Sequence, residues 1–456
     1  MSPLGDVSTH HSWLAAVLPA HARTFRVSDP SIAATLAGAG GLVQGERADV
    51  EIADPHRTTG DAAHVVITLD ATQDEGGSLA VRVLRRLRGA ARVRVQARRI
   101  RRRMLRRGWA HAATVLWDLE QPVHLPGRHE RLRELRPAEW LPARALVLAS
   151  RAGPAPSLLD AAVAEASQSV DDDIRFTWPL AREGLMIVLS DRHVVRVAVG
   201  TGRRKLELLG SALDALAAAE PPAIVAGAIP WVEGSGRVGL ADWTVERRLP
   251  GQPARRLSAP LLESCVDFLV ALHRSGTGSR QWSISDDARV VAEVCSSDAA
   301  AEAVLALGAR LDERLGDLDR GFGHGDLWAP NVLVQGERLS GVVDWDTAGP
   351  DRLPAIDLLH LLLTARRQRR REYIGVGLVA HHLPWARAGG DAIVRSYCRK
   401  LGISLDAGRL EALVLAYWLD RVSFELRLFA DRVERPVWMR NNVLGVLDAL
   451  GSGFRP

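Results

Sequence analysis

Residues 321–346 read GFGHGDLWAPNVLVQGERLSGVVDWD, and three polar groups stand out in this stretch. The first is HGD at 324–326, the second is Asn331, and the third is DWD at 344–346. One loop therefore supplies an Asp and an Asn, and a second Asp follows a nearby apolar run. This spacing is typical of a kinase-type centre for phosphoryl transfer.

Phosphoryl transfer requires little covalent chemistry from the protein. The main tasks of the protein are to orient a hydroxyl group and to neutralise phosphate charge. We expect Asp326 to accept the hydroxyl proton or to orient the hydroxyl. Asn331, through its amide oxygen, and Asp344 are the candidate ligands of Mg²⁺, which prefers hard oxygen donors. His324, the other candidate catalytic residue, is expected to hydrogen-bond beneath the loop and orient its backbone.

The residues between these groups predict a hairpin. Val332–Val334 is a short apolar run, Gln335–Glu337 is a turn, and Leu339–Val343 is a second apolar run. Such a hairpin places Asn331 and Asp344 at the same end.

HGDLWAPNVL, GVVDWD and the later PAIDLL at 354–359 together resemble the aminoglycoside phosphotransferase/choline kinase family. HGD and DWD, in place of HRD and DFG, distinguish this pattern from eukaryotic protein kinases. The resemblance implies a protein-kinase-like fold, ATP or GTP with Mg²⁺, and a small-molecule hydroxyl as acceptor. It also implies structural support from Asp346 and from Asp357, which would brace the catalytic loop. A helix N-cap is an alternative role for Asp357.

An N-terminal lobe is expected upstream of this centre. Leu185–Leu189 and His193–Val199 predict a hairpin. The resemblance implies that the loop ending at Gly184 covers the phosphates, although apolar residues replace the polar ones often found after that glycine.

Arg196 stands in the middle of the apolar run HVVRVAVG, where a cation requires a buried anion. The resemblance implies that Arg196 contacts phosphates and pairs with an acid of the helix predicted over Lys205–Ala217. Glu207 is the first candidate for that acid, and Asp214 is the second. An alternative is a surface-facing Arg in an alternating strand.

Trp243–Gly251 reads as a strand that ends in a turn. The resemblance implies that this segment is the hinge between two lobes. The backbone of Glu246, Arg247 and Arg248 would then hydrogen-bond the purine.

The predicted fold class is α+β, with a bilobal protein-kinase-like phosphotransferase domain preceded by a small α/β domain. The predicted parts are listed here: 1–150, the α/β domain; 151–173, a linker; 174–251, the N-lobe with its hinge; 252–456, the C-lobe with a helical acceptor-binding region. Strand patterns at 49–53, 64–69, 76–83 and 113–117, with a helix at 98–107, underlie the first part. It weakly resembles a degenerate class I methyltransferase domain.

The sequence predicts helices at 412–429 and 437–450. The resemblance implies that these helices build the acceptor pocket. The arginine-rich run 366–371 predicts a solvated helix face. If it borders the pocket, it favours a neutral sugar-like or an anionic acceptor over a polycationic aminoglycoside.

Composition and cysteine content indicate the cellular environment in which the protein is expected. The chain has 456 residues, a net charge of +5 and three cysteines without paired or metal-type spacing. We expect a cytoplasmic protein without a signal peptide or transmembrane segment, from a GC-rich bacterial genome. The arginine-rich run 82–107 has no interleaved aromatic residues, so no DNA or RNA partner is expected.

The function predicted from these observations is transfer of the γ-phosphate of ATP or GTP to a hydroxyl of a sugar-like, aminocyclitol or other small molecule. A nucleotide-binding pseudokinase or scaffold is the alternative. A methyltransferase is a third and weaker interpretation.

Overall fold

The structure is a computed structural model. The residues that it describes are 18–27, 33–34, 36–37, 42–45, 48–53, 64–70, 95–107, 110–118, 121–124, 144–151, 156–172, 174, 180–182, 185–276, 283–429 and 432–453. The chain forms two compact units. The first contains Met1–Glu207 and Trp231–Arg248, and the second contains Leu208–Pro230 and Leu249–Pro456.

The first unit begins with a mixed sheet in the order β2-β1-β3-β4-β7-β5-β6. Its strands are β1 (Thr24–Val27), β2 (Val43–Gln44), β3 (Val50–Ala53), β4 (His64–Asp70), β5 (His111–Asp118), β6 (Gln121–His124) and β7 (Arg144–Ser150). The neighbouring pairs among β1 to β4 are parallel, whereas β7 runs antiparallel to both β4 and β5. The strands predicted at 49–53, 64–69 and 113–117 are therefore confirmed. Residues 95–106 are helical, and the strand predicted at 76–83 lies outside the described residues.

The same unit holds a five-stranded antiparallel sheet in the order β11-β12-β10-β9-β8. Its strands are β8 (Leu180–Arg182), β9 (Leu185–Leu189), β10 (His193–Ala198), β11 (Val232–Val238) and β12 (Ala241–Arg247). The predicted hairpin is formed by β9 and β10, and α5 (Gly202–Ala218) follows it. The first unit ends at Arg248, within the segment predicted as the hinge.

Helix α4 (Leu158–Ser169) lies inside the predicted linker 151–173. Ser157 caps it, and Asp160 completes a capping box. Its buried face packs against β10, β11 and β12, in a core that also contains Phe25 of β1 and Val50 of β3. The boundaries drawn from the sequence are corrected accordingly, because 158–169 is part of this core. Flanking Pro, Gly and Asp residues obscured its helical apolar spacing.

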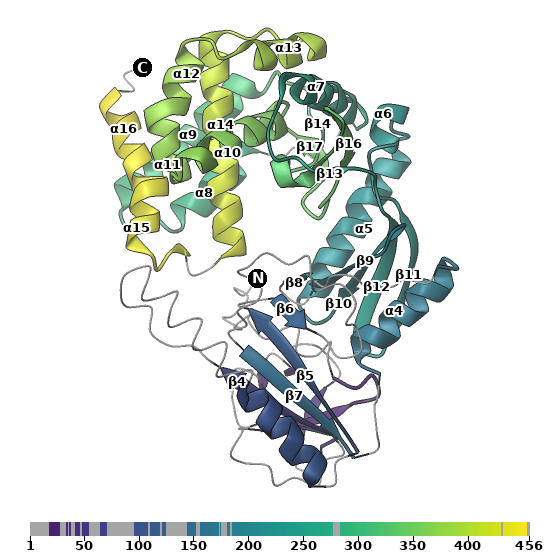
Figure 1. Ribbon diagram of the computed structural model, residues 1–456. Coiled ribbons are helices and arrows are strands. Elements are labelled where there is room, and N and C mark those ends of the chain that lie inside the picture. The colour runs from purple at the N-terminus through teal and green to yellow at the C-terminus, as the bar shows by residue number, and fades with distance from the viewer. Residues whose placement is uncertain are drawn as a thin grey trace. The chain divides into compact units, whose positions relative to one another are not determined.

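The second unit combines small sheets with helices (Figure 1). Its strands are β13 (Gln252–Pro253), β14 (Gly321–Gly323), β15 (Val332–Gln335), β16 (Arg338–Val342) and β17 (Gly349–Arg352). β15 and β16 form the predicted hairpin, and β14 pairs with β17. The HGD motif and Asn331 therefore lie between β14 and β15, and the DWD follows β16.

The α-helices of this unit are α6 (Ala223–Ala226), α7 (Ala259–Arg274), α8 (Ile284–Ala292), α9 (Asp298–Leu315), α10 (Ile356–Arg370), α11 (Ile374–Gly377), α12 (Leu383–Arg387), α13 (Ala392–Leu401), α14 (Ala407–Leu428), α15 (Pro436–Met439) and α16 (Gly445–Gly453). A short 3-10 helix, η4 (Ala329–Asn331), precedes β15. Two π-helical segments, η5 (Leu378–His382) and η7 (Arg440–Leu444), connect α11 to α12 and α15 to α16. Helix α14 is buried on nearly all sides and contacts α8, α9, α10 and α12 (Figure 1).

The predicted α+β fold class is confirmed. Within the part of the chain that the structure describes, no helix combines the length and the apolar character that a membrane crossing requires.

Candidate active site

The loop that carries HGD is held by one carboxylate. Oδ2 of Asp357 accepts the backbone N–H of His324 at 2.7 Å, and Oδ1 accepts that of Gly325 at 2.8 Å. Hydrogen bonds to a charged group contribute about 1.5–3 kcal/mol each. Asp357 is the second residue of α10, whose N-cap is Ala355, so the structure gives it the bracing position and not the N-cap position.

His324 is fully buried beneath this loop. Its Nε2–H donates to the carbonyl of Val343 at 3.0 Å, and its Nδ1 accepts the N–H of Asp326 at 3.3 Å. The ring of Trp345 lies edge-on to the imidazole at 4.8 Å. Burial lowers the pKa of His324, which favours the neutral ring. The histidine therefore ties the catalytic loop to the strand that leads to Asp344.

Gly325 cannot be replaced by a larger residue without disturbance. Its φ is +82°, in the left-handed region. A Cβ atom at this position would lie 2.4 Å from the carbonyl oxygen of Thr347. Both the conformation and the close approach require glycine.

Asp326 projects from this loop with its side chain 29% exposed. Its Oδ1 lies 3.1 Å from Nε2 of His360 and 3.1 Å from Nη1 of Arg421. Burial alone would raise the pKa of Asp326. The hydrogen bond from His360 and the charge of Arg421 oppose the effect of burial, and the net pKa of Asp326 lies below its usual value. Asp326 is therefore a carboxylate at neutral pH and a weak base, which suits orientation of a hydroxyl group.

Asn331 and Asp344 lie at the same end of the β15–β16 hairpin. Val332 faces Val342 in the ladder, and the N–H of Val343 donates to the carbonyl of Asn331 at 3.0 Å. The side-chain N–H₂ of Asn331 donates to the carbonyl of Asp326 at 3.0 Å, so its amide oxygen is the atom that can face a cation.

This donor set fits Mg²⁺. In the described ranges, no three His, Cys, Asp or Glu side chains are grouped so as to hold a metal ion. Mg²⁺ does not need such a group, because one or two protein oxygens, waters and substrate phosphates satisfy it. The carboxylate of Asp344 and the amide of Asn331 offer oxygen donors of this kind.

Three non-glycine residues around this site adopt left-handed backbone conformations. They are Asp344 (φ +72°), Asp351 (φ +68°) and Ala355 (φ +68°). Each costs on the order of 1–3 kcal/mol, and such conformations cluster at functional sites. Asp346, which was expected to give structural support, lies half-buried two residues after Asp344.

Arg196 is buried in β10 and bonds Glu246 of β12, with Nε 2.6 Å from Oε1. The sequence correctly indicated a buried anion, but named Glu207 and Asp214. Both are exposed on α5, because Leu206, Leu209 and Leu213 form its buried face. Glu207 lies 3.5 Å from Arg204 instead.

The other residues predicted to bind nucleotide lie at the end of β12. The side chain of Arg247 bonds Glu233 at 3.0 Å, and the N–H of Arg248 donates to the carbonyl of Arg192 at 2.7 Å. Their contact with a purine stays a prediction. Gly184 lies outside the described residues.

His360 and Arg421 were missed by the sequence analysis. The signal for His360 was a histidine three residues after Asp357 in an apolar helix, and the signal for Arg421 was an Asp-Arg pair inside the apolar run of α14. Polar groups in such positions require partners.

The arginine run 366–371 is at the far end of α10 from Asp357. Arg366 bonds Asp391 at 2.8 Å and lies over the ring of Trp385, whereas Arg369, Arg370 and Arg371 are exposed. The run lies roughly 10–15 Å along the helix beyond His360, at 1.5 Å per residue. It forms a largely solvated face, as the simpler interpretation predicted.

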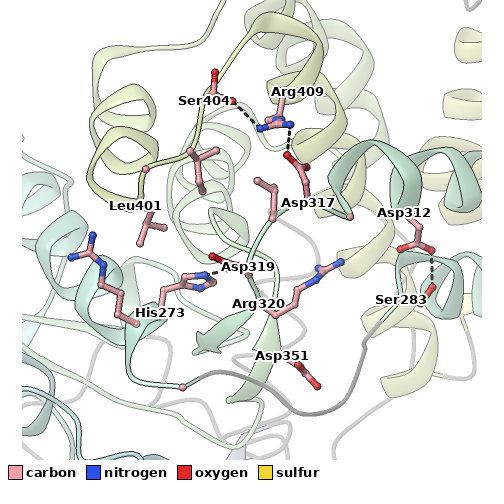
Figure 2. A pocket seen from close by; sticks show the side chains of 16 residues that line it. His273, Ser283, Asp312, Asp317, Asp319, Arg320, Asp351, Leu401, Ser404 and Arg409 are labelled. Carbon is pink, nitrogen blue, oxygen red and sulfur yellow. Dashed lines mark hydrogen bonds and ion pairs between the residues drawn. The ribbon is translucent and has the colours of Figure 1, made fainter.

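A separate pocket of about 1120 Å³ opens between α7, α9 and the loop before α14, and Asp326, Asn331 and Asp344 do not line it (Figure 2). Several of its polar residues have partners within the protein. Arg409 bonds Asp317 at 2.7 Å, and His273 donates to the carbonyl of Asp319 at 3.1 Å. This arrangement indicates a structural role for His273.

Substitution of Gly325 by alanine tests the geometry of the catalytic loop. Gly336 is a matched control, since its φ is +66° but no atom lies within 4 Å of its Cβ position. Gly336→Ala is expected to cost about 1–2 kcal/mol of unfolding free energy from the left-handed conformation alone. Gly325→Ala should cost more, because it also displaces Thr347. Denaturant unfolding measures both, and equal losses would contradict the described close approach.

Comparison with known proteins adds to this geometry. Residues 190–393 match the model of the phosphotransferase enzyme family. No curated protein matches the chain.

Several solved structures are similar at low identity. Aminoglycoside phosphotransferase APH(3'')-Id from Streptomyces rimosus, in complex with ADP and streptomycin, is 18% identical, with 57% of this chain and 97% of that chain covered and a TM-score of 0.39. The GDP complex of aminoglycoside 2'-phosphotransferase-IIIa is 13% identical, with 64% and 98% covered and a TM-score of 0.43. At these sequence identities and TM-scores, the similarity does not indicate what this chain binds. The family match includes Asp326, Asn331, Asp344 and Asp357, and the predicted resemblance to a phosphotransferase family is confirmed for residues 190–393.

Proposed function

We propose that this protein transfers the γ-phosphate of ATP or GTP to a hydroxyl group of a small molecule. Asp326 would orient the acceptor hydroxyl, and Asn331 and Asp344 would hold Mg²⁺ against the nucleotide phosphates. Bound Mg²⁺ would neutralise charge on the phosphate oxygens. Arg196 and the Glu246–Arg248 segment are proposed to contribute to nucleotide binding.

One observation carries the proposal. An ionised carboxylate, an amide and a second carboxylate stand on one braced hairpin and loop, with Asp357 holding the backbone N–H groups of His324 and Gly325. Catalysis of phosphoryl transfer consists mainly of positioning and charge neutralisation. A loop fixed by buried hydrogen bonds supplies the first requirement.

The charges around Asp326 support an acceptor that is not a polycation. Asp420 of α14 bonds Arg421 at 2.8 Å and Arg352 at 3.4 Å. Asp287 of α8 bonds Arg427 at 3.0 Å. Each of these carboxylates has an arginine partner, whereas a polycationic acceptor gains affinity from carboxylates that lack such partners. We therefore propose a neutral polyhydroxy acceptor.

The first test replaces the proposed catalytic and metal-binding carboxylates. Asp326→Ala and Asp344→Ala are each expected to reduce phosphoryl transfer by at least about 100-fold, because orientation or charge neutralisation is lost. Asp317→Ala, which removes a carboxylate outside the site, should leave the rate unchanged. Transfer is measured by mass spectrometry of a hydroxyl-compound library with Mg·ATP and Mg·GTP.

Wild-type rates in Asp326→Ala would remove that residue from the mechanism. A nucleotide-binding pseudokinase remains the second candidate, since the buried Arg196 is engaged by Glu246 of β12. Thermal stabilisation by nucleotide, without turnover on any acceptor, would favour that candidate.

The acceptor class has its own test. Neutral polyols and sugars should yield phosphate monoesters, and polycationic aminoglycosides of similar size should react more slowly. Competition assays with both classes at equal concentration measure this preference. Faster phosphorylation of the polycations would overturn the proposed acceptor class without removing the phosphotransferase activity.

A further inference from the structure

Two buried side chains from different helices contact the same oxygen of Asp326. Nε2 of His360, on α10, lies 3.1 Å from Oδ1. Nη1 of Arg421, on α14, also lies 3.1 Å from Oδ1. The side chains of His360 and Arg421 are only 10% and 6% exposed, whereas that of Asp326 is 29% exposed. Two buried side chains therefore hold Oδ1 of the more exposed Asp326.

The surroundings of His360 fix its orientation and its tautomer. Nδ1 lies 3.3 Å from the hydroxyl of Tyr417 and 3.2 Å from that of Thr364, and either hydroxyl can donate to it. The ionised Asp326 can only accept, so the proton of the neutral imidazole belongs on Nε2. Burial and the charge of Arg421 lower the pKa of His360, which favours this neutral form.

Arg421 is fixed in the same way. Its Nε donates to Oδ2 of Asp420 at 2.8 Å, and its guanidinium lies over the ring of Phe424 at 4.7 Å. Asp420 also contacts Arg352 at 3.4 Å, and Arg352 donates to the carbonyl of Thr347 at 2.8 Å.

The contacts then return to the catalytic loop, because the hydroxyl of Thr347 donates to the carbonyl of His324 at 3.0 Å. The chain of contacts therefore starts and ends on the HGD loop, and it passes through helix α14. A movement of Asp326 would disturb several buried, charge-assisted hydrogen bonds at once.

We propose that His360 and Arg421 are positioning residues that hold Oδ1 of Asp326, so that Oδ2 faces the acceptor hydroxyl. This inference rests on the proposed phosphotransferase function. With Oδ1 engaged twice, rotation of the carboxylate breaks both contacts, and one oxygen is kept for the hydroxyl. A positioned group of this kind lowers the barrier by avoiding reorganisation during the reaction.

The kinetic test uses substitutions that keep or remove the N–H donors. His360→Leu is expected to lower kcat about 10- to 100-fold, the scale of a small misplacement of a catalytic group. The KM for nucleotide should change less than about twofold, because the ligands of the phosphates are untouched. His360→Gln, which can place an amide N–H near the position of Nε2, should recover part of the loss. Arg421→Lys should likewise retain more activity than Arg421→Met.

A matched control separates positioning from stability. His382 is also a buried histidine of this unit, and His382→Leu should leave kcat unchanged. Thermal unfolding establishes that each variant is folded at the assay temperature. A folded His360→Leu variant with the kcat of the wild type, or an equal loss in His382→Leu, would overturn the inference.

A second readout needs no turnover and therefore separates the inference from the proposed function. In ¹⁵N-labelled protein, His360 should be protonated on Nε2, with an imidazole N–H resonance that His360→Gln identifies by its absence. That resonance should shift in Asp326→Ala and persist in Asp344→Ala. Protonation on Nδ1, or a resonance insensitive to Asp326→Ala, would overturn the inference even in an active enzyme. If the resonances behave as expected but no acceptor is phosphorylated, the proposed function fails and the positioning contact stands.

Discussion

The two hydrogen bonds from the HGD backbone to Asp357 are the constraint on which the site depends. They fix the loop at His324 and Gly325, and His324 in turn bonds the strand that leads to Asp344. The spacing between Asp326 and the proposed metal ligands Asn331 and Asp344 is therefore set by hydrogen bonds to the backbone of the loop and of the adjoining strand. The glycine at 325 is required because Thr347 closes over it.

Buried ion pairs connect the HGD loop to helix α14. Arg421 would be costly to bury alone, but Asp326 and Asp420 compensate its charge. The carboxylate of Asp326 thereby takes part in the packing of α14. The same arrangement lowers the pKa of Asp326, against the effect of burial, and makes it better suited to orienting a hydroxyl than to removing its proton. Structure and proposed chemistry therefore depend on the same contacts.

The structural features that depend on the spacing of residues within a short segment could be predicted from the sequence. The β15–β16 hairpin and the placement of Asn331 and Asp344 follow from alternating apolar runs around a turn. The partner of Arg196 could not be obtained in this way, since Glu246 is fifty residues away and only the β10–β12 pairing brings it near. His360 and Arg421 meet Asp326 through the packing of α10 and α14, which depends on tertiary structure. Helix α4 was missed because its flanks contain the residues typical of a linker.

The most direct measurement is ³¹P NMR of the purified chain with Mg²⁺, ATP and a mixture of neutral polyhydroxy compounds. We expect the γ-phosphate resonance to be lost while ADP and a phosphate monoester appear in equal amounts. An unchanged γ-phosphate, or its appearance as inorganic phosphate alone, would contradict the assignment of Asp326, Asn331 and Asp344 to phosphoryl transfer.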